Sequence, residues 1–245
     1  MYRFFVGQDQ IEEKVIHITG EDRNHIRNVL RMKPGEEILI SSGENKEYHC
    51  AVEAFTDTEV LAEIRYVQET DFELSSRIYL FQGLPKGDKM EFILQKAVEL
   101  GVYEVIPVAA KRCVVKLDAK KEAAKCRRWE AISESAAKQS KRMVIPKVTN
   151  VMTFSEAVRY ASQLDIKLIP YELAKGMSET KELLEGITPG QSIGIFIGPE
   201  GGFEESEVEQ AKAAGVMPVT LGRRILRTET AGMTILSILM YLLEN

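Results

Sequence analysis

Cysteine, histidine and long apolar runs are scarce in this chain, and each shortage excludes a class of protein. Cys50, Cys113 and Cys126 form no C-x-x-C pair and are odd in number, so we expect neither a disulfide framework nor a zinc cluster. The three histidines form no H-x-x-x-H pair, which argues against a helical metal site. Free thiols without a framework favour a reducing compartment.

The longest apolar stretch is too short to cross a membrane. Ala231–Leu243 spans about 13 residues, whereas a bilayer needs roughly 20 apolar residues, so we expect a buried core helix there. No long apolar segment follows Met1–Phe5, which argues against a signal peptide. With 44% hydrophobic and 28% charged residues, the composition is that of a globular protein. We therefore expect a soluble, cytoplasmic protein without a membrane partner.

The net charge of −5 conceals a basic segment in the middle of the chain. Residues 1–70 carry a net −6 and residues 151–245 a net −5, whereas residues 71–150 hold 16 basic against 10 acidic residues, a net +6. Within 111–147 the imbalance is 12 basic to 4 acidic residues. Such asymmetry indicates a polyanionic partner. The acidic N-terminal part can contact that partner only if its few cations share one face: Arg3, Arg23, Arg27 and Arg31.

The first 70 residues have the pattern of a small β-rich domain. Short apolar runs with alternation or β-branching are separated by turn segments such as Lys33–Gly35 and Ser41–Gly43. Within Asp22–Arg31, apolar residues recur at helical spacing and predict one helix. Several short strands and one helix suggest a small barrel. The predicted strands are Val15–Ile18, Glu37–Ile40, Tyr48–Val52 and Val60–Ile64.

The hydrophobic period changes after Gln68–Ser76, a polar stretch that we expect to be a linker or a crossing strand. Compact apolar strands now alternate with helical patterns, which predicts a mostly parallel α/β sheet. Asp88 is the expected N-cap of the first of these helices, and Gly101 its terminating glycine. Strands are predicted near 78–81, 105–108, 147–148, 166–169, 193–197 and 216–221. Helices are predicted near 88–100, 120–140, 178–184, 204–214 and 230–243, with a short one from 155.

A glycine-rich segment, Ile197–Phe203, follows a buried strand and precedes a helix. Ligands of α/β sheets bind at the carboxyl ends of the strands, and glycine lets the backbone approach a ligand closely. The segment is neither G-x-G-x-x-G nor a Walker loop, and the carboxylate of Glu200 would repel a pyrophosphate. A neutral or cationic ligand is therefore favoured. A plain strand–turn–helix connection is the alternative.

A second segment, Leu221–Ala231, also follows a strand and opens a helix. We expect Thr228 or Glu229 to cap that helix. The basic residues of the segment could form a solvated turn, a salt-bridge site of a dimer, or a binding site for a polyanion. They are Arg223, Arg224 and Arg227.

Two further segments carry hydrogen-bond donors or cations. On the helix predicted at 120–140, Ser135, Gln139 and Arg142 lie on neighbouring turns of one face. Gln and Arg donors can bind phosphates or base edges, and a solvated basic helix is the alternative. In Asn24–Gly35, two arginines four residues apart share a helix face, where they could also pair with nearby carboxylates.

Together these segments resemble the bacterial 16S ribosomal RNA uridine N3-methyltransferases, which belong to the SPOUT class of RNA methyltransferases. G-P-E-G-G-F is followed about 20 residues later by L-G-x-R-I-L-R-T-E-T-A. Lys141 departs from the family, which usually has a small residue there, and Asn24 stands where a second histidine is common. The resemblance extends over essentially the whole chain, through His25–Met32, Lys86–Met90, Lys96–Gly101 and Gln139–Arg142.

The resemblance implies an α/β SPOUT domain with a C-terminal trefoil knot, preceded by a small PUA-like β-barrel domain. Residues 1–72 would form the RNA-binding barrel, and residues 73–245 the methyltransferase domain. It further implies S-adenosylmethionine as the cofactor, bound in the knot in a bent form, no metal, and a homodimer. The RNA partner would be 16S ribosomal RNA within the small ribosomal subunit, with one specific uridine of the decoding region as the methylated base.

The resemblance also places the cofactor between the two loop segments, with the strand end at 170–172 as a third wall. Glu200 is expected to bind ribose hydroxyls or to favour the cationic cofactor. The expected cofactor-binding residues are Pro170, Tyr171, Glu172, Ile197, Gly198, Pro199, Glu200, Gly201, Gly202, Leu221, Gly222, Ile225, Leu226, Arg227, Thr228, Thr230 and Ala231. The expected RNA-binding residues are Arg3, Arg23, Arg27, Arg31, Lys86, Arg112, Lys120, Lys121, Arg127, Arg128, Gln139, Arg142 and Arg223.

Methyl transfer from a sulfonium is an in-line displacement, so the protein must align the reacting groups and needs no metal to do so. N3 of uridine carries a proton at neutral pH, so a base is required, or cations that stabilise the N3 anion. Arg142, Arg227 and Glu229 are the candidate catalytic residues. Because N3 lies on the pairing edge of the base, the uridine must be unpaired or flipped to react.

Three other interpretations stay open at this point. Another SPOUT enzyme, such as a ribose 2′-O-methyltransferase, would reveal itself by ribose methylation in digested RNA. A nonenzymatic RNA-binding ribosome-assembly factor would keep the barrel but would not bind S-adenosylmethionine. A small-molecule α/β enzyme would act without RNA, and its basic middle segment would have no purpose.

Overall fold

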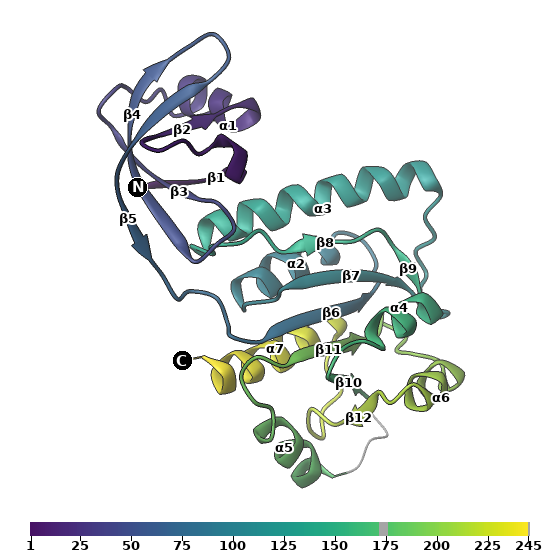
Figure 1. Ribbon diagram of the computed structural model, residues 1–245. Helices are drawn as coiled ribbons and strands as arrows, with labels where there is room; N and C mark the ends of the chain where they lie inside the picture. Colours follow the sequence, from purple (N-terminus) through teal and green to yellow (C-terminus); the bar gives the residue numbers. More distant parts are fainter. Residues whose placement is uncertain (172–175, 245) are drawn as a thin grey trace. The chain divides into compact units, whose positions relative to one another are not determined.

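The computed structural model describes residues 1–171 and 176–244 and divides into two units, whose elements can be followed by colour in Figure 1. The first unit consists of Met1–Glu73 together with Ala137–Ile145, and the second of the other described residues. The predicted division into residues 1–72 and 73–245 does not account for Ala137–Ile145, which belong to the first unit. No helix of the described residues has the length and apolar character that a membrane span requires.

The first unit is built on a five-stranded sheet with the order β1-β3-β4-β5-β2. β1 pairs with β3 in parallel, and the other pairs are antiparallel. Alternate side chains such as Ile38 and Ile40 are fully buried, as expected for strands with one face on a core. The strands are β1 (Tyr2–Phe5), β2 (Val15–Ile18), β3 (Glu37–Ser41), β4 (Lys46–Phe55) and β5 (Val60–Glu69).

The helix predicted between residues 22 and 31 is present but changes its winding. It begins as α1 (Gly20–Asn24) and continues as a π-helical turn over His25–Val29. Ile26 in that turn is fully buried in the core of the unit. A short 3-10 turn, Gln8–Gln10, lies between β1 and β2.

Arg3 is buried within the first unit, which overturns the prediction that it contacts RNA. Its side chain is 4% exposed, and its guanidinium donates to the carboxylate of Glu47 and, at 2.8 Å, to Ser41 Oγ. A buried guanidinium needs such a partner because desolvation of its charge is costly. Arg3 therefore does not share an exposed face with the other three arginines, which contact of all four with RNA would require. Arg23 and Arg27 do lie together, since both donate to the carbonyl oxygen of Thr56.

Lys141 adopts the left-handed backbone conformation, with φ of +60°. That conformation costs a residue with a Cβ roughly 1 kcal/mol, whereas glycine adopts it freely. Lys141 therefore occupies a strained position.

Replacing Lys141 with glycine is expected to stabilise the protein by about 1 kcal/mol, because the strain is relieved. Urea unfolding followed by circular dichroism measures the change. Lys141→Ala, which removes the same charge and keeps the Cβ, should give no such gain. Equal midpoints for the glycine and alanine variants would show that the left-handed conformation is not the source of strain.

The second unit contains a seven-stranded sheet whose pairs are all parallel. Its order is β12-β10-β11-β6-β7-β8, and β9 also pairs with β7. The strands are β6 (Arg77–Gly83), β7 (Glu104–Ala109), β8 (Lys147–Val148), β9 (Met152–Thr153), β10 (Ile166–Pro170), β11 (Ser192–Ile197) and β12 (Met217–Val219). The helices are α2 (Lys89–Glu99), α3 (Ala119–Gln139), α4 (Phe154–Ala161), α5 (Met177–Glu185), α6 (Glu205–Ala213) and α7 (Thr228–Leu243).

The ends of α2 agree with the predicted caps, whereas the start of α7 does not. α2 follows Asp88, the predicted N-cap, and is terminated near Gly101, whose φ is +87°. α7 begins at Thr228 with Arg227 at the N-cap position, so the prediction of a Thr228 or Glu229 cap is wrong. The hydroxyl of Thr228 has other partners, which belong to the functional site.

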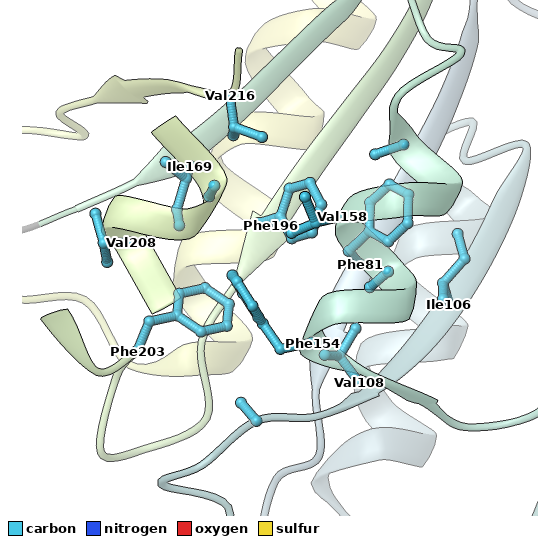
Figure 2. Packing of buried hydrophobic residues seen from close by; sticks show 14 of the residues in the cluster. Phe81, Ile106, Val108, Phe154, Val158, Ile169, Phe196, Phe203, Val208 and Val216 are labelled. Carbon is cyan, nitrogen blue, oxygen red and sulfur yellow. The ribbon is translucent and has the colours of Figure 1, made fainter. Parts of the chain in front are cut away.

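Aromatic side chains on the central strands anchor the core of the second unit (Figure 2). The rings of Phe81 on β6 and Phe196 on β11 stack with their centroids 4.4 Å apart. Phe154 at the start of α4 packs against Phe196 and against Phe203, which directly follows the glycine-rich loop. Stacked and edge contacts of this kind stabilise a core beyond their buried area. They also fix both ends of the segment that carries the candidate site.

Candidate functional site

A cavity of about 630 Å³ lies where β10, β11 and β12 of the second unit end. This is within the usual size range of small-molecule sites, and the carboxyl ends of parallel strands are the position expected from the sheet topology. Two loops, 198–203 and 220–227, form most of its wall. The lining residues are Lys89, Arg112, Pro170, Tyr171, Ile197, Gly198, Pro199, Glu200, Gly201, Gly202, Phe203, Thr220, Leu221, Gly222, Arg224, Ile225, Leu226, Arg227, Thr228 and Ala231.

The loop that follows β11 turns back tightly on itself. A Cβ at Gly198 would lie 3.0 Å from the backbone of Gly202, and the amide of Gly202 donates to the carbonyl of Pro199 at 2.9 Å. Beneath the loop, a Cβ at Gly83 would lie 2.6 Å from the backbone nitrogen of Pro199. No side chain fits in either place, so glycine at these positions allows the loop to rest on the end of β6.

Thr228 joins the two loops at the start of α7. Its hydroxyl donates to the carbonyl of Gly198 at 2.6 Å and accepts from Gln82 Nε2 at 2.9 Å. Gln82 is fully buried at the end of β6. Three segments far apart in the sequence are thus connected through one hydroxyl group.

Charged groups at the cavity are mostly cationic. Arg112 Nη1 donates to the carbonyl of Gly201 at 3.1 Å, and Lys89 Nζ lies 3.0 Å from Glu200 Oε1. The hydrogen bond with Glu200 raises the pKa of Lys89. Burial acts to raise the pKa of Glu200, but hydrogen bonds from its own backbone and from Lys89 hold it below its usual value. Both groups are therefore charged at neutral pH.

The predicted cofactor residues largely meet at this cavity. All of them line it except Thr230, which is not part of the lining, and Glu172, which lies outside the described residues. Lys89 and Arg224 line the cavity although neither was predicted to bind the cofactor. The signal for Lys89 was its place in Lys86–Met90, a segment noted in the resemblance, of which only Lys86 was given a role, in RNA binding.

The three predicted catalytic residues lie in different surroundings. Arg227 is exposed and lines the cavity. Glu229 is not among the lining residues, and its Oε2 lies 3.5 Å from Lys89 Nζ. Arg142 belongs to the first unit, where it is 5% exposed and its Nε donates to both carboxylate oxygens of Glu73, at 2.9 and 2.8 Å. Its buried guanidinium is held by that carboxylate and does not face solvent, contrary to what contact with RNA requires.

The remaining predicted RNA-binding residues are mostly exposed side chains. Arg128 on α3 is also exposed, but its Nε lies 2.6 Å from Glu91 Oε1 on α2, so part of its charge is already paired. Lys86 donates its backbone N–H to Glu200 at 3.1 Å. The exposed residues of this set are Arg27, Arg31, Lys86, Arg112, Lys120, Lys121, Arg127, Arg128, Gln139 and Arg223.

No group of three or more His, Cys, Asp or Glu side chains in the described part of the chain is placed to hold a metal ion.

Sequence and structure comparisons agree on the class of protein. A family model described as RNA methyltransferase domain matches residues 72–240, and one described as RNA methyltransferase PUA domain matches residues 18–65. The ribosomal RNA small subunit methyltransferase E of Bacillus subtilis is 38% identical, over 100% of this chain and 98% of its own length. That of Mesomycoplasma hyopneumoniae is 35% identical, over 97% of this chain and 98% of its own length.

A solved structure extends the likeness to the fold. The ribosomal RNA small subunit methyltransferase E from Neisseria gonorrhoeae, bound to S-adenosyl methionine, superposes with a TM-score of 0.84 at 33% identity, covering 99% of this chain and 98% of that one. The two domains and the cavity thus define an RNA methyltransferase with a PUA-like domain. The chain belongs to the ribosomal RNA small subunit methyltransferase E family.

Proposed function

We propose that the chain binds S-adenosylmethionine in the cavity of the second unit and methylates N3 of one uridine in the decoding region of 16S ribosomal RNA, within the small ribosomal subunit. The observation that carries the proposal is the meeting of the two loops that bear the family motifs, with Arg227 beside them. The names of the relatives support ribosomal RNA of the small subunit as the substrate, and the Neisseria structure supports the cofactor.

The residues of the cavity fit S-adenosylmethionine. A Cβ at Gly202 would have no neighbouring atom within 4 Å, so glycine at this position leaves open space beside the backbone of the loop. Backbone N–H and C=O groups there can bind the polar edge of an adenine, and Ile225 and Leu226 offer apolar surface for its ring. When bound, S-adenosylmethionine supplies a methyl group activated by a sulfonium.

The protein's own residues have two tasks in the reaction. The loops must fix the direction of attack, because an in-line displacement depends on alignment. Arg227 must stabilise the negative charge that develops on the uracil ring as N3 loses its proton. Arg227 lines the cavity from the N-cap of α7, so we propose it as the catalytic cation. The other two candidates have ion-pair partners: Glu229 lies 3.5 Å from Lys89, and Arg142 pairs with Glu73.

The RNA is expected to contact exposed cations of both units. α3 presents Lys120, Lys121 and Arg127 to solvent, and the first unit presents Arg27 and Arg31. These side chains would bind phosphates and fix the orientation of the RNA, whereas the base is selected at the cavity.

Replacing Lys120, Lys121 and Arg127 together with alanine is expected to weaken RNA binding and to reduce the slope of log affinity against log salt by about 2, since each lost phosphate contact removes roughly 0.7–0.9 from it. Filter binding of a 16S fragment across salt concentrations measures the slope.

The matched control removes the same charge elsewhere, by alanine at Lys96, Lys181 and Lys212 on α2, α5 and α6. It should keep the wild-type slope. An equal reduction in both triple variants would assign the effect to net charge instead of to α3.

Further features of the family are proposed with the same function. A trefoil knot around the cavity is supported by the path of the chain, which reaches the edge strand β12 and then returns to α7, adjacent to β11 and α2. A homodimer is supported by exposed apolar side chains near the end of α7, among them Tyr241 at 82% exposure. Residues 1–72 would serve as the RNA-binding domain and residues 73–245 as the methyltransferase domain of a cytoplasmic enzyme.

Modification mapping of ribosomal RNA tests the proposed reaction. In a strain lacking the gene, mass spectrometry of digested 16S RNA should show one uridine without its N3 methyl group, and the purified protein with S-adenosylmethionine should restore it. Comparison of naked RNA with isolated small subunits identifies the form that is modified. A missing ribose methyl group instead would overturn the N3 assignment and favour a 2′-O-methyltransferase.

A further inference from the structure

Three charged side chains meet beside the cavity, and each comes from a different segment. Lys89 Nζ, in the first turn of α2, lies 3.0 Å from Glu200 Oε1 of the glycine-rich loop and 3.5 Å from Glu229 Oε2 in the first turn of α7. All three side chains are partly buried, which strengthens their attraction relative to fully solvated pairs. A single ammonium group thus bridges the loop and the helix that form opposite parts of the site.

Glu200 also has a second contact, with the segment that precedes α2. The backbone N–H of Lys86 donates to Glu200 Oε1 at 3.1 Å. A carboxylate near the N-terminus of a helix is further stabilised by the free N–H groups there. The Glu200 carboxylate is therefore engaged by Lys89 at the start of α2 and by the backbone of Lys86. Its position makes it an anchor for the loop.

The other cations at the cavity do not replace Lys89 in this role. Arg112 donates to the carbonyl of Gly201, so it contacts the loop backbone and not the carboxylate. Arg224 and Arg227 line the cavity from the second loop, and neither is within ion-pair distance of Glu200 or Glu229 among the pairs that the described residues form. Without Lys89, the two carboxylates would face each other without a cation between them.

We propose that Lys89 is a positioning residue of the methyltransferase site, which holds the cofactor loop through Glu200 and the first turn of α7 through Glu229. The proposal rests on the proposed function, since it assigns the loop to cofactor binding and the α7 turn to catalysis by Arg227. Lys89 acts on the affinity for S-adenosylmethionine through Glu200 and on turnover through Glu229. The two effects can therefore be separated by substitutions of its partners.

Binding calorimetry with S-adenosylmethionine and steady-state kinetics on small-subunit RNA test this division. Lys89→Met should raise the Kd of S-adenosylmethionine about 10-fold and lower kcat about 10-fold, as expected for the loss of two partly buried ion pairs. Glu200→Gln should reproduce the change in Kd with little change in kcat. Glu229→Gln should reproduce the change in kcat with little change in Kd.

Double variants show whether Lys89 acts through its partners. Kd for Lys89→Met with Glu200→Gln should equal that of either single variant, because the second change removes a contact already lost. Lys89→Arg should recover most of both losses. Lys96→Met is the matched control: this lysine is on the same helix, has the same 35% side-chain exposure and pairs with Glu99, and its removal should change neither constant.

Other outcomes would overturn the proposal in distinguishable ways. Additive effects of the Lys89 and Glu200 changes on Kd would mean that Glu200 contacts the cofactor independently of Lys89. A kcat for Glu229→Gln far below that of Lys89→Met, with loss of the acidic limb of the pH–rate profile, would make Glu229 the base. Failure of the wild-type protein to bind S-adenosylmethionine would overturn the proposed function and, with it, the role of Lys89.

Discussion

Gly83→Ala is expected to weaken S-adenosylmethionine binding by about 100-fold, although the residue does not line the cavity. The added Cβ would lie 2.6 Å from both the nitrogen and Cδ of Pro199, and 3.0 Å from the carbonyl carbon of Gly198. Backbone cannot yield to such a contact as a flexible side chain can, so the loop must move away from β6. Loss of about 3 kcal/mol of contacts between the displaced loop and the cofactor corresponds to roughly 100-fold in affinity.

Calorimetry on Gly83→Ala and on Gly232→Ala separates loop displacement from a general effect of added methyl groups. Gly232 is buried in α7 next to β6 and β11, but a Cβ there would meet no atom closer than 3.8 Å. The Gly232→Ala variant should therefore bind S-adenosylmethionine with wild-type affinity. If Gly83→Ala does not fold, Gly198→Ala presses on the same loop at 3.0 Å from Gly202. Wild-type affinity in folded protein with either substitution would exclude the loop from the cofactor site.

Arg227→Ala is expected to lower kcat on small-subunit RNA by roughly 100- to 1,000-fold while the protein stays folded and still binds S-adenosylmethionine. The magnitude is that of removing one donor that stabilises charge in a transition state. The side chain is exposed at the N-cap of α7, and its carbonyl, which accepts from Ala231 at 2.8 Å, is unaffected by the substitution. Stability should therefore change little.

Arg159→Ala on α4 serves as a control for the loss of an exposed arginine that does not line the cavity. It should retain full turnover. Single-turnover kinetics with saturating RNA would show whether the loss in Arg227→Ala is in the chemical step or in RNA affinity. Full activity of Arg227→Ala would remove this residue from the mechanism.

The parts of the site that depend on local pattern could be predicted from the sequence. Ile197–Phe203 and Leu221–Ala231 each follow a strand and precede a helix, and parallel strands bring such loops to one edge of the sheet. The alternation of strands and helices likewise predicted the second unit, apart from the two-residue strand β9. In the first unit β1 was missed, because the bulky residues of Tyr2–Phe5 show no alternation.

Features that depend on contacts distant in the sequence could not be predicted. Arg3 and Arg142 look like free cations in the sequence, yet the fold pairs them with Glu47 and Glu73. Lys89 was overlooked for the opposite reason, since only the fold brings Glu200 and Glu229 to it. Charge composition identifies a basic segment, but burial and pairing decide which of its side chains can reach a partner.

The membership of Ala137–Ile145 in the first unit has a consequence for synthesis. Arg3 donates to Met143 Sδ, and Lys138 pairs with Asp22, so the N-terminal sheet receives contacts from residues more than a hundred positions later. Contacts of such sequence separation form late because loop closure must precede them. The first strand to leave the ribosome therefore completes its packing only after more than half of the polypeptide has been made. A nascent chain that ends at residue 73 already holds Glu47, the partner of Arg3, but lacks Met143 beside Arg3 and Arg142 beside Glu73.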